Sequence, residues 1–151
     1  MQKFIFYTGM LLMLYSFKKD NAANLYVEEM NWQQLSRVTF KDTWTDTYKM
    51  KTERAIFDTS IKKMRGKTIS IAGFLIPTTT YGNEYVLSEN PYSGCYFCGN
   101  AGIESVIELK FKGNDIRYKL DRFIKVEGIL ALNELNTIDF IYVLHNAKEI
   151  K

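Results

Sequence analysis

Two apolar segments of the chain each carry a glycine near their middle, and this feature constrains the fold most. Lys67–Ile76 (KTISIAGFLI) is rich in β-branched residues, contains Gly73 and stops at Pro77, while Phe123–Leu132 (FIKVEGILAL) contains Gly128. A glycine inside a strand commonly marks a bulge or a sharp bend, which a sheet needs when it closes into a barrel. The two segments therefore predict long strands that curve around a small barrel.

Three further segments complete the strand pattern. They are Glu84–Ser88, Glu104–Lys112 and about Asp139–Ala147, with a turn expected at Gly113–Asp115 and a short strand at Arg117–Leu120. In Glu104–Lys112 apolar residues alternate with polar ones, as in a strand that buries one face. Five curved strands predict a mainly β protein built on a small OB-like five-stranded barrel. A β-sandwich is the alternative arrangement of the same strands.

A shorter amphipathic region precedes the barrel strands. Good helix formers over Val27–Ser36 predict a short helix, and the period-2 pattern of Val38–Lys51 predicts one or two strands with a turn near Asp46. Asp58 is placed to cap a second short helix, which Gly66 ends. This region predicts a helix and strand extension at the N-terminal side of the barrel.

Length and charge limit the remaining options. A chain of 151 residues suits one domain with one core. Its 46% hydrophobic and 25% charged residues exclude a disordered or collagen-like protein. The formal net charge of +3 is too small to indicate nucleic-acid binding, which we do not expect. We therefore expect a single OB-like domain over residues 24–151.

The first 23 residues have the pattern of an export signal. Lys3 precedes an apolar run from Phe4 to Phe17, which at about 1.5 Å per residue is too short for a ~30 Å hydrocarbon core. The pattern predicts a signal peptide over residues 1–23 and a periplasmic or cell-envelope protein. An uncleaved N-terminal membrane anchor is the alternative. Three lysines and one aspartate give residues 1–23 a net charge of +2, so +1 of the total +3 remains on residues 24–151.

Both cysteines fall in one glycine-rich segment, Asn90–Glu104, here called the Cys loop. Cys95 and Cys98 form a C-x-x-C pair, which can close a disulfide, hold a metal ion or cycle between dithiol and disulfide. The loop also contains three glycines, whose backbone freedom allows tight turns and close approach of a ligand or another chain. These loop-shaping residues are Gly94, Gly99 and Gly102.

A metal site needs more ligands than the cysteine pair supplies. Structural zinc takes four ligands, so a mononuclear site has to add His145, the only histidine, with Glu104 or Asp115. The other route is a homodimer through the Cys loop, in which a second chain lends its cysteines. The metal in either arrangement would be a zinc or copper ion.

The remaining interpretations of the pair are a structural disulfide and a redox dithiol. A disulfide is expected in an oxidising compartment, although so short a ring often strains the bond. Dithiol catalysis of the thioredoxin type requires a βαβ pattern and a helix after the first cysteine, and Gly99–Gly102 is poor helix material. Haem attachment is excluded because Gly99 stands where histidine is required. The sequence holds no G-x-S-x-G or phosphate-loop motif, so no catalytic residue is expected.

Four segments together resemble a family of small exported bacterial proteins that share a domain of unknown function with an OB-like barrel. The segments are Gly66–Pro77 (GKTISIAGFLIP), Tyr85–Ser88 (YVLS), Cys95–Glu104 (CYFCGNAGIE) and Val126–Leu130 (VEGIL), and the resemblance covers about residues 30–148. Ile103 stands where many relatives have proline, which loosens the loop. No activity is established for that family. The resemblance implies a metal-handling transporter component as partner, because some relatives are encoded beside such components. The glycine-rich C-x-x-C loop independently leaves an envelope protein as the other candidate partner.

The sequence thus favours an exported binding module of the bacterial envelope. Because no catalytic motif is present, a non-enzymatic function is favoured over an enzymatic one. Its Cys95–Cys98 loop would bind a metal ion or a protein partner. A thiol–disulfide redox protein that uses the same two cysteines is the alternative function.

Overall fold

The computed structural model describes residues 26–46, 49–78, 84–113, 118–135 and 140–151. The predicted leader, residues 1–23, lies outside these ranges. The elements are β1 (Glu28–Glu29), α2 (Trp32–Leu35), β2 (Val38–Thr45), β3 (Met50–Phe57), α3 (Thr59–Lys62), β4 (Thr68–Pro77), β5 (Tyr85–Ser88), the 3₁₀ turns η2 (Tyr92–Gly94), η3 (Tyr96–Cys98) and η4 (Ile103–Ser105), then β6 (Val106–Phe111), β7 (Arg122–Leu132) and β8 (Tyr142–Ile150). No helix among these residues is long and apolar enough to cross a membrane.

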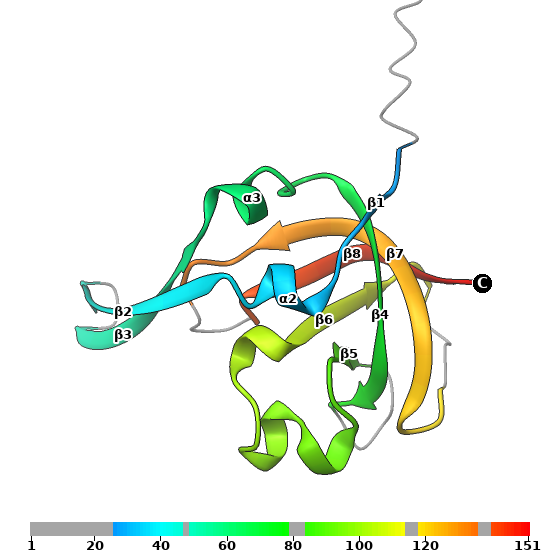
Figure 1. Cartoon of the computed structure of the whole chain (residues 1–151). Helices are drawn as coiled ribbons and strands as arrows, with labels where there is room; N and C mark the ends of the chain where they lie inside the picture. The colour runs from blue at the N-terminus through cyan, green and yellow to red at the C-terminus, as the bar shows by residue number, and fades with distance from the viewer. Residues whose placement is uncertain (1–25, 47–48, 79–83, 114–117, 136–139) are drawn as a thin grey trace, which may run out of the picture.

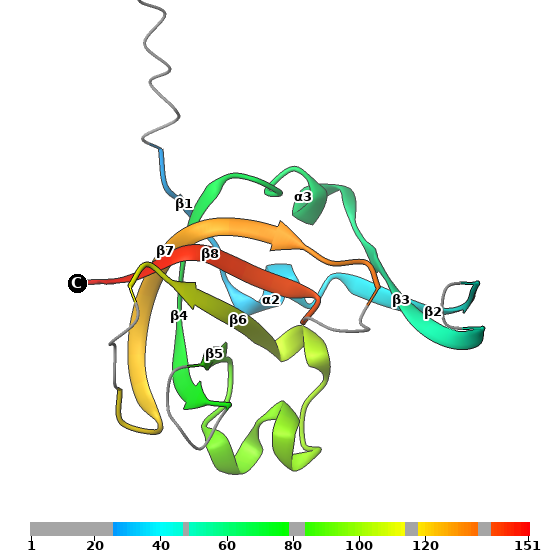
Figure 2. The same ribbon diagram turned by 180° about the vertical axis from the view of Figure 1, so that it is seen from behind.

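Five strands close into the predicted OB-like barrel (Figures 1 and 2). Around the barrel the order is β4, β5, β6, β8 and β7, and β7 pairs back to β4. β6 and β8 run parallel, and the other pairs in the ring are antiparallel. One sheet that closes on itself confirms the barrel, so the β-sandwich alternative is wrong. The interior is filled by branched apolar side chains such as Ile71, Leu87 and Leu130.

The two mid-strand glycines lie where the barrel leaves no room for a side chain. A Cβ on Gly128 would be 2.8 Å from the backbone oxygen of His145, and the β7–β8 register shifts between Glu127 and Ile129. This confirms the predicted bulge. A Cβ on Gly73 would be 2.5 Å from the Ser88 backbone oxygen, although the β4–β7 register continues unbroken past Gly73. That glycine therefore allows β5 to approach β4 closely.

The predicted N-terminal helix is shorter than its sequence pattern. β1 runs parallel to β4, and ion pairs anchor it through Glu28 to Lys67 (2.5 Å) and Glu29 to Lys125 (2.6 Å). Helix α2 begins only after Asn31, which shares a capping box with the side chain of Gln34. Because the cap and the pairing with β4 both act at residues 28–31, the chain changes from strand to helix there.

The β2–β3 hairpin extends away from the barrel as an arm (Figures 1 and 2). Its register runs from Val38 opposite Phe57 to Thr45 opposite Met50. This confirms the first predicted strand and the turn near Asp46, whereas the second strand extends beyond the predicted end at Lys51 to Phe57. Val38 and Phe57 are buried at its base, whereas Trp44 is 58% exposed near its tip. The arm therefore joins the core at one end only.

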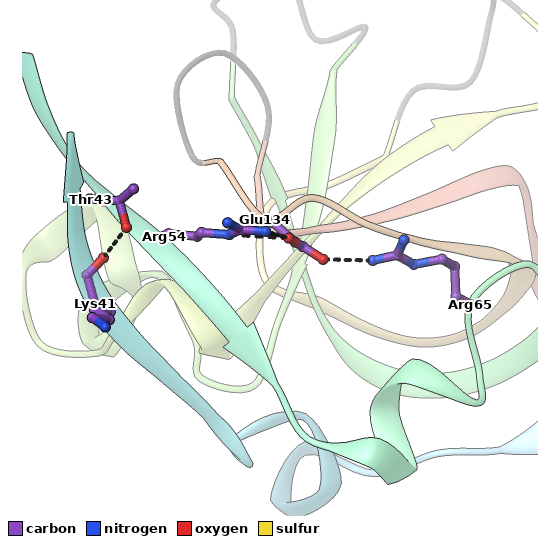
Figure 3. A network of polar contacts seen from close by, with 5 residues as sticks. All are labelled: Lys41, Thr43, Arg54, Arg65 and Glu134. Carbon is purple, nitrogen blue, oxygen red and sulfur yellow. Dashed lines mark hydrogen bonds and ion pairs between the residues drawn. The ribbon is translucent and has the colours of Figure 1, made fainter. Parts of the chain in front are cut away.

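A carboxylate between two arginines ties the arm to the barrel (Figure 3). Glu134, which follows β7, pairs with Arg54 of β3 and with Arg65 after α3. The hydrogen bond from Arg54 is the main reason why the pKa of Glu134 is lowered. The backbone N–H of Ala55 also donates to the Glu134 carbonyl at 2.8 Å. These contacts fix the base of the arm.

The second predicted helix forms as α3. Asp58 caps it by accepting from the backbone N–H groups of Ser60 (2.8 Å) and Ile61 (3.1 Å). Gly66 has a φ of +77° and redirects the chain into β4, as expected for a terminating glycine. The predicted strand at Arg117–Leu120 begins outside the described residues, and its described part, Tyr118–Leu120, is not a strand.

Candidate functional site

The Cys loop covers the outside of the barrel between β5 and β6. Its residue Cys95 is fully buried and packs in a small apolar cluster that is separate from the barrel interior, here called the outer cluster. The cluster consists of Ile76, Val86, Cys95 and Val106, with Tyr96, Ile103 and Phe140 packed against it. The thiol of Cys95 therefore serves as an apolar core group, a common role for buried cysteine.

The Cys loop lies against the outer face of strands β5 and β6. OB folds bind oligonucleotides and oligosaccharides on the face of their second and third strands, which are β5 and β6 here. All four residues of β5 are buried, including Val86, which the outer cluster covers. The chain's own Cys loop thus covers Val86 of β5 and Val106 of β6 on the face that other OB folds use for a ligand.

Several hydrogen bonds hold the loop in place. The Asp121 carboxylate accepts from the backbone N–H of Tyr92 at 2.7 Å, and the Asn100 side chain donates to the Ser93 carbonyl at 3.1 Å. Gly99 has a φ of +72°, a region that favours glycine. The Glu104 carboxylate lies against Gly102, where a Cβ would leave it no room. These contacts anchor the loop to the segment around Asp121 and join its two ends to each other.

The two cysteines differ in exposure and are free thiols in this structure. Cys95 is buried, while Cys98 is exposed and donates from Sγ to the Tyr92 carbonyl at 3.1 Å. The pKa of the Cys98 thiol is raised, first by desolvation and then by the charge and hydrogen bond of Cys95. Catalytic dithiols need the opposite, an exposed thiol whose pKa is lowered.

The candidate metal ligands are not gathered around this pair. Among the described residues, no group of three or more His, Cys, Asp or Glu side chains could hold a metal ion. Glu104 folds back on Gly102, as above, and Asp115 lies outside the described residues. His145 is exposed on β8, where it pairs with Lys110 of β6 and lines a shallow pocket of about 190 Å³. Of the candidate ligands within the described ranges, the structure brings together only Cys95 and Cys98.

Two exposed aromatic side chains stand beside Cys98. Tyr92 is 46% exposed and Phe97 is 43% exposed, and Phe97 is held edge-on by Tyr96 and Phe140, with ring centroids 5.6 and 6.1 Å away. The bond from Cys98 to the Tyr92 carbonyl ties the two turns together. We call Tyr92, Phe97 and Cys98 the loop surface.

Sequence reasoning placed the cysteines but missed these aromatics as site residues. The signal was present: residues Asn90–Ile103 contain no charged side chain, in a chain of which 25% is charged.

No family model, curated protein or solved structure matches this chain. The loop surface is therefore the feature on which a function can be based.

A second exposed apolar pair adjoins this surface. Asp121, which binds the Tyr92 backbone, lies between Leu120 and Phe123, both of which are largely exposed. Phe123 packs edge-on against Phe74 of β4, with ring centroids 5.1 Å apart. The apolar side chains around the Cys loop thus come from three segments of the chain.

Proposed function

We propose that this protein is an exported, non-catalytic binding module that docks on a protein partner of the bacterial envelope through the loop surface. The observation that carries the proposal is the exposure of Tyr92 and Phe97 on a rigid loop without charge. The predicted leader at residues 1–23 supports an envelope partner, because it would direct the domain out of the cytoplasm.

The physical reason is the composition of protein interfaces. Their buried centres are enriched in aromatic residues and depleted of charged ones. Asp121 holds the Tyr92 backbone, and Tyr96 and Phe140 hold the Phe97 ring, so ordering the Phe97 ring on docking would cost little further conformational entropy. A partner with an apolar, uncharged contact surface fits this chemistry.

The other proposed uses of the loop have less support. Metal binding would need a third ligand, and none is gathered at the pair within the described ranges. A redox enzyme would need an activated thiol, whereas the pKa of Cys98 is raised. Binding of nucleic acid on the barrel face would need the Cys loop to leave the surface of β5.

Site-specific photocrosslinking in cells of the source organism tests the proposal. A photoreactive phenylalanine analogue replaces Phe97 in the full chain, and a matched variant carries it at Trp44, an exposed aromatic of the arm. We expect one discrete adduct with an envelope protein from position 97 and none of that mass from position 44. The same adduct from both positions, or no adduct from position 97, would contradict docking through the loop surface.

A further inference from the structure

We infer that Cys98 is the residue at which this protein enters thiol–disulfide exchange, and that Cys95 is the resolving thiol that completes the reaction. The chain is then a substrate of oxidation by an accessible disulfide, and the product is a Cys95–Cys98 disulfide. This inference concerns the thiols alone and does not rest on the proposed docking function.

Access decides which thiol reacts first. An incoming disulfide has to reach the attacking sulfur, and Cys98 is exposed whereas Cys95 has no exposed surface. Cys95 is enclosed by Val86, Val106 and Ile76 in the outer cluster. This order is the reverse of that in thioredoxin-like motifs, where the first cysteine is the attacking thiol.

The first step is an exchange at Cys98. The Cys98 thiolate attacks one sulfur of the incoming disulfide R–S–S–R, whose S–S bond breaks. A Cys98–S–S–R mixed disulfide forms, and the other half of the incoming disulfide leaves as the first R–S⁻ and takes up a proton from water. The proton of Cys98 goes to solvent before the attack, so charge and mass balance.

The second step uses the neighbour that the structure provides. Cys95 and Cys98 lie in one tight turn, in which the backbone N–H of Cys98 donates to the Cys95 carbonyl at 3.2 Å. Once deprotonated, Cys95 attacks the Cys98 sulfur, the Cys98–S–S–R bond breaks, and the second R–SH is released. Two protein thiols are oxidised by two electrons, and one external disulfide is reduced to two thiols.

Burial gives Cys95 a role that an exposed thiol could not fill. A second exposed thiol would itself form mixed disulfides or join two chains, whereas the burial of Cys95 keeps it from an external disulfide. The loop's other anchors, from Asp121 to Tyr92 and from Asn100 to Ser93, do not involve sulfur. They keep the loop closed while the bond forms.

Mass spectrometry of single-cysteine variants in the presence of glutathione disulfide tests the order. We expect Cys95→Ser to accumulate a glutathione adduct on Cys98. We expect Cys98→Ser to react at least about tenfold more slowly, since buried Cys95 reacts only through local opening. The wild-type chain should lose two hydrogens and retain no adduct. Equal rates for the two variants, or a persistent wild-type adduct, would overturn the inference.

A measurement without variants guards against misfolding of Cys95→Ser, which places a hydroxyl in the outer cluster. The reduced wild-type chain is treated with a limiting amount of iodoacetamide, and its peptides are mapped. Alkylation of Cys98 well before Cys95 supports the assigned order. Alkylation of Cys95 first, or of both at one rate, overturns it.

Discussion

At the scale of single residues, the two cysteines are three positions apart in the sequence but lie in different environments. Cys95 is enclosed in an apolar cluster, and Cys98 lies at the surface beside it. The C-x-x-C pattern predicts only that the two sulfurs can approach each other. Which one is buried depends on how the flanking strands β5 and β6 fold back on the loop, and on Ile76 and Phe140, which lie farther away in sequence. The sequence could therefore locate the pair but not assign its roles.

The raised pKa of Cys98 predicts a pH dependence. The fold favours the neutral thiol, so the thiolate should appear at higher pH in the native chain than in the unfolded one. We expect alkylation of native Cys98 at pH 8 to be slower than in urea, with a midpoint displaced to higher pH. By linkage, the stability that this shift contributes is present below the unfolded pKa and is lost as pH rises through the folded one. A native midpoint at or below the denatured one would contradict this.

The buried hydroxyl of Tyr142 predicts a specific loss of stability. It donates to the Leu35 carbonyl at 2.6 Å, and burial raises its pKa, so that the proton stays in place. Tyr142→Phe keeps the ring against Phe57 but removes the donor from a buried carbonyl. We expect unfolding free energy to fall by about 1–3 kcal/mol in urea titrations. The exposed Tyr92→Phe should change it by less than about 0.5 kcal/mol, and equal effects would contradict the account.

At the scale of elements, the strands follow their sequence patterns more closely than the helices do. Strand β4 was expected to end at Ile76 with a stop at Pro77, and it ends at Pro77. The helix expected over Val27–Ser36 is instead a two-residue strand followed by one capped turn. Helix-forming residues at Val27–Ser36 are overridden because pairing with β4 stabilises the extended backbone at Glu28 and Glu29. That pairing is non-local, and no local pattern contains it.

The bulge in β7 gives an element-scale prediction. Gly128→Ala would place a Cβ 2.7 Å from Leu144 Cγ and 2.8 Å from a backbone oxygen, so strand β8 would have to shift. We expect unfolding free energy to fall by about 1–3 kcal/mol. Gly94→Ala is the matched control, because its Cβ would have its nearest contact at 3.8 Å. Thermal or urea unfolding that finds the two substitutions equally tolerated would contradict the assigned role of Gly128.

At the scale of the whole molecule, the sequence predicts the barrel but not the packing of the Cys loop against its outer surface. Mid-strand glycines and alternating segments are local signals of curved strands, and they led to the observed closure. The Cys loop packs against the outer surface of β5. The position of the β2–β3 arm depends on the ion pair between Arg54 and Glu134, which are 80 residues apart. Such contacts leave no periodic pattern in the chain. Because the Cys loop covers β5, the proposed docking site is the loop surface and not the barrel face.

The most direct test of that proposal is the affinity of the purified chain for the protein crosslinked at position 97. Phe97→Ser removes an exposed ring from the proposed contact, and Trp44→Ser removes one from the arm. We predict that Phe97→Ser raises Kd at least about tenfold, equivalent to ~1.4 kcal/mol, while Trp44→Ser leaves Kd within about twofold. An unchanged Kd for Phe97→Ser, or an equal rise for Trp44→Ser, would contradict the account.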